Sequence, residues 1–205
     1  MELLVGTTNS GKLTEVEEAL KGLPVKVIPL KQLATWPEII EDGKTYEENA
    51  LKKARALAAF SGFVTLADDS GLEVEALSGA PGVHSARYSG EDADDARNNE
   101  KLLSALAGVP QERRGARFVC VIALVSPILN GGGEWIFHGS CEGWIAFEPG
   151  GKNGFGYDPI FFYPPLGRTF GEIDRQTKEH YSHRGKALAK LKQAFPSVLQ
   201  SITNP

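Results

Sequence analysis

Two adjacent carboxylates follow a short apolar stretch in the first half of the chain. Residues 64–67 lead directly into Asp68 and Asp69. In open α/β folds, ligands bind at the edge of the sheet where strands end. Side chains alternate across a strand, so the two carboxylates should point in different directions. One could bind a hard cation such as Mg²⁺ while the other orients or deprotonates a water molecule; a solvated turn is the alternative interpretation.

A glycine-rich segment near the N-terminus could bind an anion. Residues 6–12 match the phosphate-binding pattern G-x-x-x-x-G-K, but Leu13 stands where that pattern has the Ser or Thr that contacts Mg²⁺. The helix predicted to follow presents backbone N–H groups and the positive end of its dipole at its first turn. The Lys12 ammonium adds a further donor. An anion site is one interpretation, and a helix merely capped by Asn9 or Ser10 is the other.

Three further segments carry polar groups that could bind a nucleotide. Asn49 and Lys53 are four residues apart on a predicted helix and share a face, with Glu41 upstream; a solvated charged face is the alternative. Residues 154–159 place two aromatic side chains and a carboxylate among glycines, which suits base stacking or simply anchors a loop. Residues 182–186 open the last predicted helix with donors for an anion or a base carbonyl; a capped, solvated helix start is the alternative. The loop at 79–90 could approach phosphates or serve as a rigid loop.

The elements that must position these groups alternate between strands and helices. Strands are expected at 2–7, 25–30 and 63–67, and helices at 11–21, 45–61, 93–107 and 182–195, the last ending before Pro196. Residues 31–44 and 70–92 are expected to be loops. Two long β-rich segments, 116–125 and 134–147, flank the hairpin signal at 130–133. This order predicts a mixed α/β sheet.

Composition narrows the class of protein. The 205 residues fit one large domain or two lobes that share a sheet, and 41% hydrophobic with 23% charged residues is ordinary for a soluble enzyme. A net charge of −4 argues against a general nucleic-acid binder. No apolar run approaches the length of a membrane span, and the N-terminus lacks the features of a signal peptide. Cys120 and Cys141 are expected to be reduced thiols in a cytoplasmic protein.

In this order, the segments resemble the inosine/xanthosine triphosphate pyrophosphatase family, also called Ham1-like or dITP/XTP diphosphatases. The resemblance is carried by residues 7–12, 41–43, 48–50, 67–72, 79–82, 85–90, 154–161 and 182–185. It implies Mg²⁺-dependent hydrolysis of nonstandard purine nucleoside triphosphates (ITP, dITP, XTP) to the monophosphate and pyrophosphate, which removes them from the nucleotide pool. It also implies a single domain over 1–205, an elongated mixed sheet with flanking helices, two lobes around a central cleft, and a homodimer.

The resemblance also assigns roles to residues. It makes Asp69 the catalytic carboxylate and a metal ligand, with Glu41 and Asp68 supporting the metal, although Glu38 lies close to Glu41 in the sequence. The residues that it implies for substrate binding are Thr7, Thr8, Asn9, Ser10, Gly11, Lys12, Lys53, Ser70, Phe155, Gly156, Tyr157, Asp158, Lys178, His183 and Arg184. Phe155 would stack on the base, and Asp158, Lys178, His183 and Arg184 would line its pocket.

A mechanistic hypothesis follows. Lys12 and Lys53 offset the charge of the triphosphate while Asp69 aligns water on the α-phosphorus, which requires all three side chains to lie together. Donors from His183 or Arg184 would meet the 6-oxo group of hypoxanthine or xanthine, whereas the amino group of adenine would face them as a second donor. Guanine also carries a 6-oxo group, so this argument does not exclude it.

Three other functions fit parts of the pattern. A P-loop ATPase or kinase would leave a nucleoside diphosphate, and Leu13 counts against it. A Maf-like pyrophosphatase would act on other nucleotides. A nucleotide-sensing module would bind without turnover, but a pure binder of polyanions gains nothing from Asp68 and Asp69 without a metal.

Overall fold

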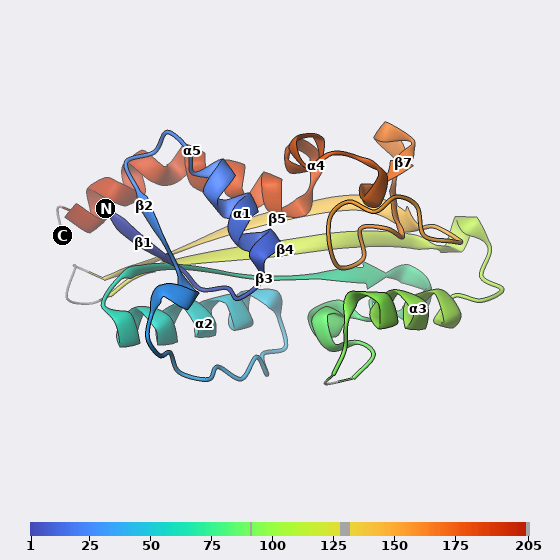
Figure 1. The fold of residues 1–205 in the computed structure, drawn as a ribbon, viewed down its shortest axis with the longest axis horizontal. Helices are drawn as coiled ribbons and strands as arrows, with labels where there is room; N and C mark the ends of the chain where they lie inside the picture. Colours follow the sequence, from blue (N-terminus) through green and yellow to red (C-terminus); the bar gives the residue numbers. More distant parts are fainter. Residues whose placement is uncertain (91, 128–131, 204–205) are drawn as a thin grey trace. The chain divides into compact units, whose positions relative to one another are not determined.

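The computed structural model describes residues 1–90, 92–127 and 132–203 (Figure 1). The chain divides into two compact units. Unit 1 comprises Met1–Asp69, Cys120–Gly139 and Arg184–Pro205, and unit 2 comprises Ser70–Val119 and Ser140–His183. The helices and strands, in order, are β1 (Glu2–Val5), α1 (Ser10–Ala19), β2 (Lys26–Pro29), α2 (Tyr46–Ser61), β3 (Val64–Val74), α3 (Asp95–Ala105), β4 (Gly115–Ser126), β5 (Gly133–Ile145), β6 (Phe161–Tyr163), β7 (Arg168–Thr169), α4 (Arg175–Tyr181) and α5 (His183–Thr203).

The strands of the described residues form one seven-stranded sheet in the order β2-β1-β3-β4-β5-β6-β7. β1 runs parallel to both β2 and β3, whereas β6 is antiparallel to β5 and to β7. The predicted mixed α/β sheet with flanking helices is therefore confirmed.

Unit 1 buries both faces of its strands. Along β1, Leu3 and Val5 pack with apolar residues of α1 and α5, whereas Leu4 packs with Leu57 of α2 and Ile28 of β2. Figure 1 shows the same arrangement, with α1 and α5 on one side of β1 and α2 on the other. This alternation follows from the two-residue period of a strand. It means that successive residues of the neighbouring β3 also face different helices.

Unit 2 has an aromatic core. Phe161 of β6 packs against Phe118 of β4 at 4.5 Å between ring centroids and against Phe170 at 5.1 Å. Leu102 of α3 is fully buried in the same core. These contacts anchor the segment between β5 and β6, which carries residues 154–158.

The predicted end of the central strand at residue 67 is wrong. Pairing of β1 with β3 stops at Val5 and Leu66, but β3 continues through both aspartates to Val74. Leu72 and Val74 are fully buried, so apolar side chains resume their alternation after the carboxylates and favour a strand over a turn. The aspartates therefore lie inside β3, beside the end of β1. The segment 70–92, which was expected to be a loop, begins as part of this strand and later contains the 3₁₀ helix η3 (Gly82–Arg87).

The predicted end of the last helix is also wrong. α5 continues through Pro196 to Thr203. Proline removes one backbone hydrogen bond from a helix interior. Val198 is buried beyond it and Ile202 packs against the unit 1 core, so apolar burial continues past the proline.

The other predicted helices and strands are present with small shifts at their ends. β6, β7 and α4, each of seven residues or fewer, were not expected. The predicted hairpin turn at 130–133 includes residues 130 and 131, which lie outside the described residues.

Candidate active site

A group of charged and amide side chains gathers in unit 1 around the aspartates of β3. We call it the charge cluster. α1, α2, β3, α5 and the loop before α2 supply its members, which are Lys12, Glu15, Glu41, Asn49, Lys53, Asp68, Asp69 and Arg184. As predicted from strand alternation, the two aspartates face different partners: Asp68 contacts α1 and α5, and Asp69 contacts α2.

Asp68 is a buried anion held by two cations. Its Oδ2 lies 2.9 Å from Lys12 Nζ and 3.3 Å from Arg184 Nη2. Burial alone would raise the pKa of the Asp68 carboxyl, but the charges of Lys12, Arg184 and Lys53 lower it well below its usual range. Asp68 is therefore ionised at neutral pH, and its charge is already compensated.

Arg184 completes this buried ion-pair group. Its Nη1 lies 2.6 Å from Glu15 Oε2, and its side chain is only 2% exposed. Burial lowers the pKa of the guanidinium, but the charges of Asp68 and Glu15 outweigh that effect and raise it. The structure pairs Arg184 with two carboxylates of unit 1. The role in a base pocket expected from the sequence stays a prediction.

Asp69 is in a different electrostatic position. Asn49 Nδ2 donates to Asp69 Oδ2 at 3.0 Å. Burial raises the pKa of Asp69 above its usual value, opposed by the hydrogen bond from Asn49 and the charges of Lys53 and Lys12, and reinforced by the nearby charge of Glu41. Asp69 is thus a buried carboxylate with enhanced basicity and two lysines near it.

Asn49 is held so that only its amide nitrogen can face Asp69. Its Oδ1 accepts the N–H of Gly43 at 2.8 Å. A Cβ on residue 43 would lie 2.6 Å from that same oxygen, so this close approach requires glycine. The sequence placed Asn49 on the same helix face as Lys53, and the structure adds that Asn49 orients Asp69.

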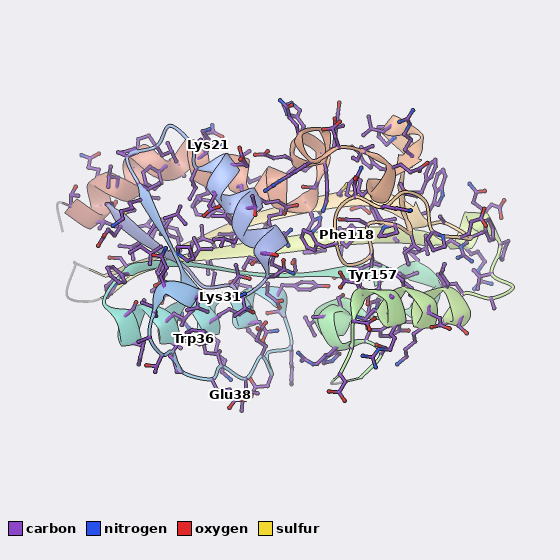
Figure 2. The ribbon with its side chains drawn as sticks, viewed as in Figure 1. Lys21, Lys31, Trp36, Glu38, Phe118 and Tyr157 are labelled. Carbon is purple, nitrogen blue, oxygen red and sulfur yellow. The ribbon has the colours of Figure 1, made fainter. Side chains whose placement is uncertain are left out.

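Lys53 and Glu41 form the outer part of the charge cluster. Lys53 Nζ lies 2.8 Å from Glu41 Oε1 and donates to the backbone oxygen of Asp68 at 3.1 Å. Glu38 is exposed on the same loop and points away from α2 in Figure 2. The structure therefore distinguishes Glu41 from Glu38 as the acid that lies with the aspartates.

The segment before α1 adopts a capped helix start. Asn9 is the N-cap, and its side-chain oxygen accepts the N–H of Lys12 at 3.0 Å. Thr7 Oγ1 accepts the N–H of Asn9 at 3.2 Å, while Thr8 and Ser10 are exposed. Gly11 lies in the first turn of α1. The predicted cap at Asn9 is therefore confirmed, and Lys12 in the same turn pairs with Asp68. Anion binding by this segment stays a prediction.

A second group of polar residues lies in unit 2, around the segment 154–158, which we call the aromatic loop. Lys178 Nζ lies 2.6 Å from Asp158 Oδ2 and 4.4 Å from the ring centroid of Phe155. The N–H of Phe155 donates to the same carboxylate oxygen at 2.8 Å. Gly154 has φ +77°, and a side chain there would collide with Asp158, so this tight loop also requires glycine.

Two other residues predicted to bind substrate are buried in unit 2. Tyr157 donates its hydroxyl to Ser85 O at 2.8 Å, and the ring of His183 stacks on Phe118 at 4.5 Å. Tyr157 and Phe118 are marked in Figure 2. Ser70, the first residue of unit 2, lies within β3 and is half-buried. The hydroxyl of Tyr157 therefore stabilises the fold of this part of unit 2.

In the segments 1–90, 92–127 and 132–203, no three Asp, Glu, His or Cys side chains are grouped closely enough to hold a metal ion by themselves. Asp68 is compensated by cations, and Glu41 by Lys53.

The comparisons with known proteins identify the family. The model of the Ham1 family matches residues 3–194. This chain belongs to the Ham1 family. It is 53% identical over 190 residues to a dITP/XTP pyrophosphatase of Geobacter sulfurreducens, with 93% of this chain and 94% of that protein covered. It is 52% identical over 198 residues to one of Syntrophobacter fumaroxidans, with 97% of this chain and 83% of that protein covered.

A solved Ham1 structure agrees with this assignment. A HAM1 protein from Coxiella burnetii aligns with a TM-score of 0.87 and 46% identity, over 96% of this chain and 99% of that one. Among the helices described for this Ham1 member, none has the length and apolar character that crossing a membrane requires. Cys120 and Cys141 are both buried thiols, and burial raises the pKa of the Cys120 thiol to about 12.

Proposed function

We propose that this chain hydrolyses nonstandard purine nucleoside triphosphates (ITP, dITP and XTP) to the monophosphate and pyrophosphate. The observation that carries the proposal is that Ham1 relatives about half identical to it, over nearly its full length, are named dITP/XTP pyrophosphatases. The charge cluster supports it, because it combines one basic carboxylate with two lysines.

Asp69 acts as the catalytic carboxylate. It accepts a hydrogen bond from the attacking water and takes its proton as the water oxygen bonds to the α-phosphorus. The bond from that phosphorus to the bridging oxygen breaks, and pyrophosphate leaves. The raised pKa of Asp69 suits a general base, and Asn49 fixes the direction of its carboxylate.

Lys12 and Lys53 bind the triphosphate. Each ammonium has three donors. Lys12 can therefore keep its contact with Asp68, and Lys53 its contact with the Asp68 backbone oxygen, while each donates to a phosphate oxygen. The N-terminal end of α1, with Thr7, Thr8, Asn9, Ser10 and Gly11 around it, adds positive potential for the same anion.

The charge cluster also fits a divalent metal. The charge of Glu41 helps to raise the pKa of Asp69, and a cation between the two carboxylates would relieve that repulsion. Mg²⁺ is usually bound through one or two carboxylates plus substrate phosphates, and Glu41 and Asp69 would be those carboxylates. Bound there, Mg²⁺ supplies positive charge to the phosphate oxygens, while Asp68 holds Lys12 in place.

The aromatic loop binds the purine. Phe155 stacks on the base, and Asp158 and His183 complete the pocket. A Lys178 ammonium beside the base suits the 6-oxo group of hypoxanthine or xanthine and opposes the 6-amino group of adenine. The proposal extends to a homodimer and to the cytoplasm, since the two buried thiols suit a reducing compartment.

Pyrophosphate release tests this function. With Mg²⁺, we expect kcat/KM for ITP, dITP and XTP to exceed that for ATP by about 100-fold or more. This is the range expected where a buried hydrogen-bond donor of the site faces the 6-amino donor of adenine. With excess EDTA, we expect turnover to fall to background. Equal turnover of ATP, preference for other nucleotides, or binding of ITP without Mg²⁺-dependent turnover would contradict the proposal.

A further inference from the structure

The backbone of Gly156, in the middle of the aromatic loop, is held by two side chains of one helix. Asp95 Oδ2 accepts the N–H of Gly156 at 2.7 Å, and Asn99 Nδ2 donates to its carbonyl at 2.9 Å. Residues 95 and 99 lie one turn apart on α3 and therefore share a face. Both hydrogen-bonding groups of one residue are thus fixed by the same face of a helix.

These two hydrogen bonds lie next to Phe155, the ring proposed to stack on the base. Gly156 follows Phe155 directly and has φ +63°, a conformation that few side chains adopt. On the other side of Phe155, its N–H is held by Asp158. The two peptide groups that flank Phe155 are therefore both restrained, one by Asp158 within the loop and one by α3.

The hydrogen bond from Asn99 to Gly156 has a cost in folding free energy. Asn99 is 8% exposed, and its Oδ1 is buried with no hydrogen-bond partner. Because the carbonyl of Gly156 needs a donor, the amide cannot be reversed to relieve that oxygen. An unsatisfied buried acceptor costs free energy that an apolar residue would not. The contact with Gly156 is the benefit that the described structure shows for an asparagine at this position.

Asn98, the residue before Asn99 on α3, makes a similar contact with a different segment. Asn98 accepts the N–H of Ser89 at 2.8 Å and donates to the carbonyl of Ala86 at 3.1 Å. The Tyr157 hydroxyl bonds the carbonyl of Ser85 in that same segment. α3 therefore serves as a common support for the aromatic loop and for the segment on which Tyr157 rests.

We infer that Asp95 and Asn99 are positioning residues for purine recognition, because they set the orientation of Phe155 through the backbone of Gly156. The inference rests on the proposed function, in which Phe155 stacks on the base. In this inference, neither the Asp95 nor the Asn99 side chain contacts the substrate. Their loss should weaken ligands that carry a base and leave ligands that consist only of phosphate unaffected.

Calorimetric titration with two ligands tests this inference. IMP carries the base, and pyrophosphate, titrated with Mg²⁺, does not. We expect Asn99→Ala and Asp95→Ala each to weaken IMP binding about three- to tenfold, the range for one hydrogen bond, and to change pyrophosphate binding less than twofold. Asp95→Asn keeps an acceptor oxygen and should bind IMP like the wild type. Glu100→Ala, at an exposed position on the same helix, is the matched control.

The steady-state kinetics of ITP hydrolysis give a second readout. In the two alanine variants KM for ITP should rise by the same factor, while kcat stays within about threefold of the wild type. Asp95 is exposed, so its alanine variant tests the inference even where Asn99→Ala fails to fold. Variants that bind IMP like the wild type, or that lose IMP and pyrophosphate equally, would overturn the positioning role. A wild-type protein that binds no IMP would instead overturn the proposed function.

Discussion

Replacing Asp69 with asparagine is expected to lower kcat for ITP by about 10²- to 10⁴-fold, the contribution of a positioned general base. Asparagine keeps the size of the side chain and can still accept the hydrogen bond from Asn49, but it cannot take a proton from water. Lys12 and Lys53 remain in place, so the affinity for IMP should stay within about threefold of the wild type. Single-turnover hydrolysis and calorimetry separate these two effects.

The same variant should be more stable than the wild type at neutral pH when no metal is bound. Burial raises the pKa of Asp69 in the folded protein above its value in the unfolded chain, so ionisation of Asp69 disfavours the fold. The wild type therefore loses stability as the pH rises through the raised pKa, and Asp69→Asn does not. Urea unfolding in EDTA should show the gain at pH 7 and its disappearance once the pH is low enough to protonate Asp69 in both states. Turnover near the wild-type rate, or a loss of stability at pH 7, would count against the role given to Asp69.

Replacing Arg184 with methionine is expected to lower the free energy of unfolding by about 3–5 kcal/mol, the cost of leaving buried charges without their partner. Arg184 is 2% exposed and compensates both Asp68 and Glu15. Without it, two buried carboxylates lose the cation that they share, although Lys12 still pairs with Asp68. Urea denaturation of the two proteins measures the difference.

Two controls make this prediction specific. Arg55 pairs with Glu134 through two hydrogen bonds of 2.6 Å but is exposed, so Arg55→Met should cost less than about 1 kcal/mol. Adding Glu15→Gln to Arg184→Met should restore part of the lost stability, because one uncompensated charge is removed. Equal small losses in both arginine variants would refute the buried ion-pair group. A changed ITP-to-ATP preference in Arg184→Met would instead favour the base-pocket role expected from the sequence.

Much of the site was predictable because its chemistry depends on local sequence. The pair of aspartates after a strand, the lysine at a helix start and the spacing of Asn49 and Lys53 each indicated which residues would carry charge. Strand alternation also predicted that Asp68 and Asp69 would face different partners, which the contacts with Arg184 and Asn49 confirm.

The rest depended on residues that are distant in sequence. Whether β3 turns or continues at Asp68 is decided by burial of Leu72 and Val74 in a core assembled from other segments. Glu15 lies on the same helix as Lys12, but its partner is residue 184. The hydrogen bonds from α3 to Gly156 join residues that are 57 or more positions apart in the sequence. Nothing in the amino-acid sequence of α3 indicates these contacts.

Hydrolysis of ITP in water labelled with ¹⁸O tests the central claim most directly. If Asp69 directs water to the α-phosphorus, the label appears in the phosphate of IMP, and the released pyrophosphate is unlabelled. Label in the pyrophosphate, or formation of IDP and inorganic phosphate, would show attack at another phosphorus and contradict the account.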